Sequence, residues 1–124
     1  MRIVCVDDHP IMLQGLIQSI QKILPDATVC GFQRAEDALS YLTKNSCEIL
    51  ICEIELSGTD GLTLAQKAKI LYPTVNIIFL TVCDEKEHAR EVLKIKPSGY
   101  LVKPANKEQL TFELHNLRYS ARTV

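Results

Sequence analysis

Short apolar stretches alternate with amphipathic stretches along the whole chain, and no low-complexity linker or internal repeat interrupts them. The apolar stretches have the length of strands and are rich in β-branched or aromatic residues, which predicts β-strands. The predicted strands cover residues 3–6, 28–32, 48–52, 76–81 and 99–102.

Between these strands, apolar residues recur at the spacing of a helix face, which predicts five helices. The first, over 11–24, has a broad apolar face and ends before Pro25. The second covers 35–42, and the third runs from about 62 to 71, before Pro73.

Two helix starts are predicted from capping boxes, in which a side-chain acceptor is followed three residues later by Glu or Gln. Asp84 and Glu87 would open the fourth helix, and Asn106 and Gln109 the fifth. The fifth helix would carry three leucines on its apolar face, which are Leu110, Leu114 and Leu117.

The order of these elements predicts the fold class. Each strand is followed by a helix, and the third and fourth strands are apolar enough to be buried on both faces. Right-handed crossovers leave few topologies other than an α/β, doubly wound, five-stranded parallel sheet of (βα)5 order. In such sheets, binding sites lie at the carboxyl ends of the strands, near the point where the strand order reverses.

Composition and charge narrow the class of protein. The 124 residues are 47% hydrophobic and 23% charged, typical of one globular domain. Fifteen acidic residues against 14 basic ones give a net charge of -1, which argues against direct nucleic-acid binding. No apolar run approaches the ~20 residues of a membrane span, and the acidic pair Asp7-Asp8 comes too early for a signal peptide. We expect a cytoplasmic protein with no membrane partner.

The five cysteines are scattered, odd in number and mostly set in apolar runs; they are Cys5, Cys30, Cys47, Cys52 and Cys83. This pattern favours small buried side chains in a reducing compartment. The chain has no Cys-x-x-Cys pair, and its three histidines show no ligand spacing, so the sequence does not favour a zinc site.

Polar residues end or follow four of the predicted strands and would meet at one rim of the sheet. They are Asp7 and Asp8, Glu53, Thr81 and Lys103. Clustered carboxylates need a hard cation or a lysine to stay ionised, and oxygen ligands suit Mg²⁺. With the Lys103 ammonium and the Thr81 hydroxyl, the set could hold a phosphoryl group.

Each of these residues also has an ordinary structural interpretation. Asp7 or Asp8 could cap the first helix. Glu53 and Thr81 could be ordinary strand-end residues, and Lys103 could be a solvated loop lysine. Taken singly, these interpretations are as good as the functional one. The occurrence of all these residues together at one rim favours a functional site.

The sequence resembles the receiver domain of bacterial two-component response regulators from residue 2 to about 119. The motifs that carry the resemblance are Val6-Asp7-Asp8-His9-Pro10, the stretch from Glu53 to Leu62 with Ser57-Gly58-Thr59-Asp60-Gly61, Phe79-Leu80-Thr81, and Gly99-Tyr100-Leu101-Val102-Lys103-Pro104. The resemblance implies the flavodoxin-like receiver fold and a receiver domain over 1–120. Residues 121–124 would then be a tail or the start of a linker to an effector domain.

The resemblance also implies roles for the residues at the rim. Asp7 and Asp8 would hold Mg²⁺, with Glu55 contributing its backbone carbonyl. Lys103 and Thr81 would hold the phosphoryl oxygens.

Tyr100 falls at the aromatic position that swings inward with the threonine when a receiver is activated. The implied partners are a sensor histidine kinase and an effector or DNA-binding output domain, of LytTR or SARP-like type. Homodimerisation would use the fourth helix, fifth strand and fifth helix, or these could be ordinary solvated surface. The charged residues near this face are His88, Arg90, Glu91, Lys94 and Lys96.

Glu53 departs from the family pattern, because the family has a phosphate-accepting aspartate at this position. The extra methylene moves the carboxylate oxygen by ~1.5 Å, and small misplacements of reacting atoms can cost ~10²-fold in rate. Three interpretations stay open. Glu53 could mimic a phosphorylated aspartate in part, mark a pseudo-receiver that signals by protein contact alone, or be an introduced substitution.

We therefore expect a non-enzymatic signal-receiving domain that switches an output such as transcription. Two alternatives remain: a protein-interaction module without metal affinity, and a small Mg²⁺-dependent phosphohydrolase. The loops are too short to wall off a substrate cleft, which disfavours the phosphohydrolase.

Overall fold

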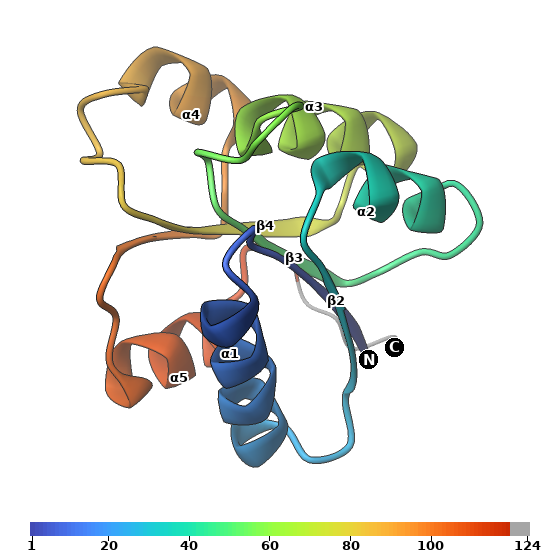
Figure 1. Ribbon diagram of the computed structural model, residues 1–124, viewed down its shortest axis with the longest axis vertical. Helices are drawn as coiled ribbons and strands as arrows, with labels where there is room; N and C mark the ends of the chain where they lie inside the picture. The colour runs from blue at the N-terminus through green and yellow to red at the C-terminus, as the bar shows by residue number, and fades with distance from the viewer. Residues whose placement is uncertain (120–124) are drawn as a thin grey trace.

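The computed structural model describes residues 1–119, and these form one parallel sheet with helices on both faces (Figure 1). The strands are β1 (Arg2–Val6), β2 (Thr28–Phe32), β3 (Ile49–Cys52), β4 (Asn76–Thr81) and β5 (Gly99–Val102). The helices are α1 (Pro10–Ile23), α2 (Ala35–Leu42), α3 (Gly61–Leu71), α4 (Ala89–Ile95) and α5 (Lys107–His115). The predicted (βα)5 fold is confirmed.

Two apolar layers hold the sheet. Figure 1 shows α1 and α5 on one face and α2, α3 and α4 on the other. In β1, Ile3 and Cys5 join the layer under α1 and α5, whereas Val4 and Val6 join the opposite layer. All four residues of β3 are buried, as are five of the six in β4, so the prediction that both strands are covered on both faces is correct.

The strand order β2-β1-β3-β4-β5 reverses at β1, because β2 pairs on one side of it and β3 on the other. Val6, the last residue of β1, pairs in register with Cys52, the last residue of β3. Asp7 directly follows β1, and Glu53 directly follows β3. They therefore leave the sheet side by side at the switch point.

The fourth helix begins later than the sequence predicts. Asp84 and Glu87 do not form a capping box: the Asp84 carboxylate accepts from the Lys86 backbone N–H, two residues on, at 2.8 Å. Residues 85–88 form a turn, and α4 starts at Ala89. Local hydrogen bonds compete with the helix here, since the Asp84 side chain holds the Lys86 N–H and the Asp84 carbonyl accepts from the Glu87 N–H at 3.1 Å, which closes a turn.

The fifth helix begins as predicted. The Asn106 side chain accepts from the Gln109 N–H, and the Gln109 side chain accepts from the Asn106 N–H, so both halves of the capping box form. The helix ends at His115, so Leu117 lies beyond it, contrary to the prediction, although its side chain still packs on the α1–α5 layer. The predicted boundary between 120 and 121 lies outside the described residues.

All five cysteines are free, and four of them are buried, as expected. Only Cys30 is half-buried. Among residues 1–119, no helix has the length and apolar character needed to cross a membrane.

Candidate functional site

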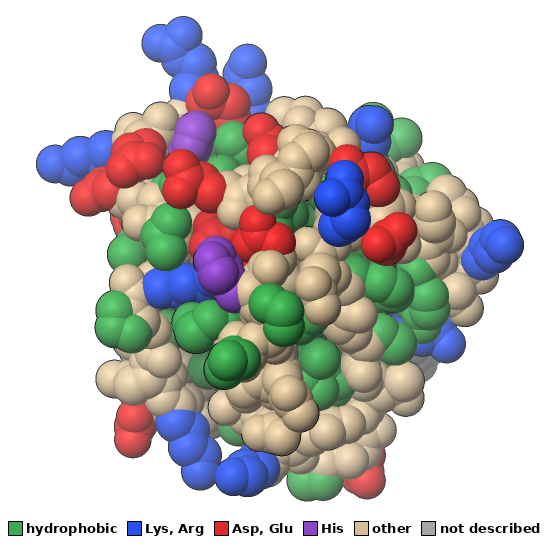
Figure 2. Space-filling model, in the orientation of Figure 1, with side chains coloured by type: hydrophobic (Ala, Val, Ile, Leu, Met, Phe, Trp, Pro, Cys, Tyr) green, Lys and Arg blue, Asp and Glu red, His purple; other side chains and the backbone are tan. Residues whose placement is uncertain are grey.

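The rim at the carboxyl ends of the strands collects the polar residues singled out in the sequence. Asp7 follows β1, Glu53 follows β3, Thr81 ends β4 and Lys103 follows β5. Three of them, Asp7, Glu53 and Thr81, are at most 4% exposed, in a chain whose other buried residues are nearly all apolar. Figure 2 shows acidic side chains and histidines gathered on the face that surrounds these loops.

The Glu53 carboxylate lies at the centre of the site and accepts from four donors. Its Oε1 atom lies 2.9 Å from the Lys103 Nζ and 3.2 Å from the Val82 backbone N. Its Oε2 atom accepts from the Thr81 hydroxyl and, at 3.1 Å, from the Glu55 backbone N–H. A buried carboxylate needs such partners, because an unpaired charge in this environment costs several kcal/mol.

Lys103 joins two carboxylates. Its Nζ lies 2.6 Å from Asp7 Oδ2 as well as 2.9 Å from Glu53 Oε1, and its side chain is 9% exposed. Burial on its own lowers the pKa of the Lys103 ammonium, but hydrogen bonds and charges of Asp7 and Glu53 outweigh it, so the pKa is raised. The lysine is therefore held in its charged form between two anions.

Gly61 sets how closely α3 approaches the site. A Cβ atom at this position would lie 2.0 Å from the Glu53 carbonyl oxygen and 2.8 Å from the carbonyl carbon. Both atoms belong to the backbone and cannot rotate away. A side chain at 61 would push α3 off the segment that carries Glu53 and Glu55.

Most of the sequence matches one known protein family. Residues 3–115 match the model of the response regulator receiver domain. The chain belongs to this family. The receiver domain resembles the uncharacterized transcriptional regulatory protein YesN of Bacillus subtilis (strain 168), at 30% identity over 94% of this chain and 32% of that protein. It also resembles the transcriptional regulatory protein RcsB of Escherichia coli (strain K12), at 29% identity over 83% of this chain and 49% of RcsB.

The chain therefore spans about a third to a half of these relatives. Among solved structures, the response regulator protein TrrA of Thermotoga maritima, in complex with Mg²⁺-BeF, superposes with a TM-score of 0.79 at 24% identity. That match covers 92% of this chain and 96% of TrrA, and it shows the shared fold.

The outer part of the receiver site is a small carboxylate and histidine cluster. Asp7, Asp8 and His9 offer ligand atoms that all lie within 4.8 Å of one another. Asp8 Oδ2 accepts from the backbone N and the hydroxyl of Ser57, both at 3.3 Å. Asp8 Oδ1 is buried without a hydrogen bond among the described residues and lies 3.1 Å from the His9 Nδ1. This oxygen accepts no hydrogen bond from residues 1–119 and lies close to a carboxylate oxygen of Asp7, and such a pair of carboxylates fits a divalent cation such as Mg²⁺.

Tyr100 does not contact the carboxylates directly, but hydrogen bonds to the Cys83 backbone connect it with Thr81. Its ring packs against Phe79 with centroids 5.9 Å apart, and its hydroxyl donates to the Cys83 carbonyl at 2.9 Å. Burial raises the pKa of Tyr100 to about 12. The Cys83 N–H in turn donates to the Thr81 hydroxyl oxygen at 3.2 Å, so a side chain at the end of β4 and one within β5 both bind the loop that contains Cys83.

Some members of the site carried no sequence signal. The backbone N–H groups of Val82 and Glu55 donate to Glu53, but a backbone donor is not tied to any residue type. Gly61 and Ser57 belong to the Ser57–Gly61 motif, and a glycine one residue after the Asp60 N-cap was a usable signal for a close approach. The Glu55 side chain itself is exposed.

Proposed function

We propose that this receiver domain adopts its signalling conformation without phosphorylation, because the Glu53 carboxylate occupies the donors that would otherwise hold a phosphoryl group. The observation that carries the proposal is the set of four donors on one buried carboxylate: the Lys103 ammonium, the Thr81 hydroxyl and two backbone N–H groups. It favours the first of the three interpretations of Glu53.

The charge balance supports partial mimicry. A phosphoryl group carries about -1.5 to -2 charges and three acceptor oxygens, whereas Glu53 supplies one charge and two oxygens. Those two oxygens already bind the lysine and the threonine. The expected bias toward the signalling state is therefore real but smaller than that of an acyl phosphate.

The same contacts argue against phosphorylation of Glu53. Each carboxylate oxygen accepts from two donors, so neither has a free lone pair directed at an incoming phosphorus atom. In-line attack requires the reacting atoms about 3–3.5 Å apart and aligned. The domain acts as a binding and signalling module and not as an enzyme.

Magnesium belongs to the proposal as a weakly held cofactor. Asp7 and Asp8 would bind it through their carboxylates and Glu55 through its backbone carbonyl. When bound, the cation would neutralise the carboxylates at the rim. Asp7 would contribute less than Asp8 to binding the cation, because Lys103 and the His9 backbone N–H already occupy its two oxygens.

The partners follow from the family. A sensor histidine kinase would contact the domain without needing to transfer phosphate to Glu53, and an output domain, DNA-binding and of LytTR or SARP-like type, would read its state. Homodimerisation through α4, β5 and α5 is supported by three exposed apolar side chains on these elements, Leu93, Val102 and Phe112. The proposed compartment is the cytoplasm, where free cysteines stay reduced.

Phosphate transfer from acetyl phosphate in the presence of Mg²⁺ tests the proposal. Intact-mass spectrometry should show no hydroxylamine-labile phosphoryl adduct on the native protein. The Glu53→Asp variant should acquire one, since its shorter side chain restores the distance for attack. A labile adduct at Glu53 itself would overturn the proposal; a folded, Mg²⁺-binding Glu53→Asp variant that stays unlabelled would show that the pocket is not a receiver pocket.

A further inference from the structure

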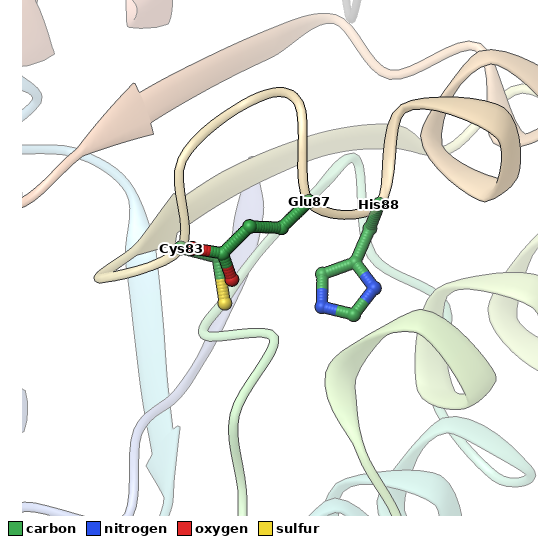
Figure 3. A group of neighbouring side chains, drawn as sticks. All are labelled: Cys83, Glu87 and His88. Atoms are coloured by element: carbon green, nitrogen blue, oxygen red, sulfur yellow. The ribbon is translucent and has the colours of Figure 1, made fainter.

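A second group of potential metal ligands lies in the segment between β4 and α4. Cys83 follows the strand by two residues, Glu87 lies in the turn, and His88 is the N-cap residue of α4. Figure 3 shows the thiol, the carboxylate and the imidazole directed toward a common region. Their ligand atoms all lie within 4.8 Å of one another.

The donor set differs from the carboxylate rim. A thiolate sulfur, an imidazole nitrogen and a carboxylate oxygen together suit zinc, whereas Mg²⁺ prefers oxygen alone. In a tetrahedral zinc site, bonds of about 2.0–2.3 Å place the ligand atoms about 3.5 Å apart. The three ligand atoms, within 4.8 Å of one another, would therefore have to close in by about 1 Å, and Glu87 is exposed and His88 half-buried.

The His88 ring differs from the other two imidazoles in having no partner. His9 Nδ1 lies 3.2 Å from Asp7 Oδ1, and His115 Nδ1 lies 3.0 Å from the Thr111 carbonyl. Within residues 1–119, neither the His88 ring nor the Glu87 carboxylate takes part in a hydrogen bond or ion pair.

Cys83 is the buried member of the group, at 1% exposure. Burial and the charges of Glu55, Glu87 and Glu53 raise the pKa of its thiol, and the Thr81 hydroxyl opposes this. The side chain is therefore a thiol when no metal is bound. The same negative surroundings favour a cation close to the sulfur.

We propose that Cys83, Glu87 and His88 form a zinc site, with water as the fourth ligand. On binding, the Zn–S bond forms as the Cys83 S–H bond breaks, and the proton passes to the solvent. No change of oxidation state is involved. This inference goes beyond the proposed function and does not depend on it.

The position of the site connects it with the receiver rim. The Cys83 N–H donates to the Thr81 hydroxyl oxygen, and the Tyr100 hydroxyl donates to the Cys83 carbonyl. Val82, the residue between Thr81 and Cys83, supplies a backbone N–H to Glu53. Zinc would hold this segment at both ends, by the sulfur of Cys83 and by the imidazole at the start of α4.

Cobalt binding tests the inference, because Co²⁺ takes zinc sites and reports thiolate ligation by absorbance. The full chain is titrated with Co²⁺ and then Zn²⁺, under reducing conditions and with excess Mg²⁺ to compete at Asp7 and Asp8. We expect one ion per chain, a sulfur-to-cobalt charge-transfer band and the visible bands of tetrahedral cobalt, all lost when zinc is added.

Variants assign the ligands. Cys83→Ser should abolish the charge-transfer band, and His88→Ala, which alters a half-buried side chain and should fold normally, should weaken binding at least about tenfold. Cys30→Ser and His115→Ala are matched controls and should bind like the native protein. Native-like affinity in Cys83→Ser and His88→Ala would overturn the inference, as would the absence of the charge-transfer band or loss of zinc on His9→Ala instead.

Discussion

The Lys103 ammonium lies 2.9 Å from the Glu53 carboxylate, and both side chains are almost fully buried. This ion pair connects the segments that follow β3 and β5, two strands that are not neighbours in the sheet. Because Lys103 also lies 2.6 Å from Asp7, one cation balances two buried anions. Removing it should therefore cost more than removing an exposed lysine.

Lys103→Met should destabilise the fold by about 3–5 kcal/mol, because it leaves buried carboxylates without their cation. In the Lys103→Met background, Glu53→Gln should cost less than in the native protein, with a coupling of about 0.5–3 kcal/mol. Urea unfolding of the two single variants and the double variant measures this coupling. Effects that add within about 0.3–0.5 kcal/mol would show that the two side chains do not act as a pair.

A second prediction concerns the approach of α3 to the site. Gly61→Ala should destabilise the protein by about 1–3 kcal/mol or more, since the new methyl meets the backbone carbonyl of Glu53. Gly15→Ala is the matched control: it lies in α1 with nothing within 4 Å of the added Cβ, and it should stabilise by about 0.4–1 kcal/mol. Thermal unfolding of both variants gives the comparison. Equal effects would contradict the close packing of α3.

The third prediction concerns how the folding stability depends on pH through Glu36, which lies outside the rim. The Thr59 backbone N–H donates to Glu36 Oε2 at 2.9 Å, and this bond is the main reason why the pKa of Glu36 is lowered to about 2. A lowered folded-state pKa contributes stability that is complete above the unfolded value of about 4.5 and is lost as the pH falls toward 2.

Glu36→Gln removes the titrating group and should therefore lower the unfolding free energy at neutral pH, with a deficit that shrinks between about pH 4.5 and 2. Denaturant unfolding of the native protein and the variant across this range provides the measurement. A deficit that stays constant down to pH 2 would rule out the Thr59 contact as its source.

Most of the fold follows from the sequence, because strand-length apolar runs alternate with amphipathic ones. The start of α4 could not be predicted from the sequence. Asp84 accepts from the N–H of Lys86 and forms a turn where a capping box was predicted. At the rim, residue types and their place after each strand identified Glu53 and Lys103. They could not identify the backbone donors Val82 and Glu55, because every residue carries an N–H group.

The Cys83, Glu87 and His88 group was missed for a related reason. Their spacing matches no common zinc motif, so the sequence did not favour a metal site. The turn over 85–88, which replaced the predicted first turn of the helix, brings the three side chains together. The error in the predicted start of the fourth helix thus concealed a local cluster within six residues.

The central claim is that the Glu53 carboxylate holds Thr81 and Lys103 as a phosphoryl group would, and the amide NMR spectrum tests it most directly. Spectra are compared for the native protein and Glu53→Asp, each with and without Mg²⁺ and beryllofluoride, a phosphoryl analogue. We predict that Glu53→Asp alone shifts the resonances of Thr81, Val82 and Tyr100, that beryllofluoride moves them back toward the native positions, and that the native spectrum barely responds. A native spectrum that matches unliganded Glu53→Asp and moves away from it on adding beryllofluoride would contradict the claim.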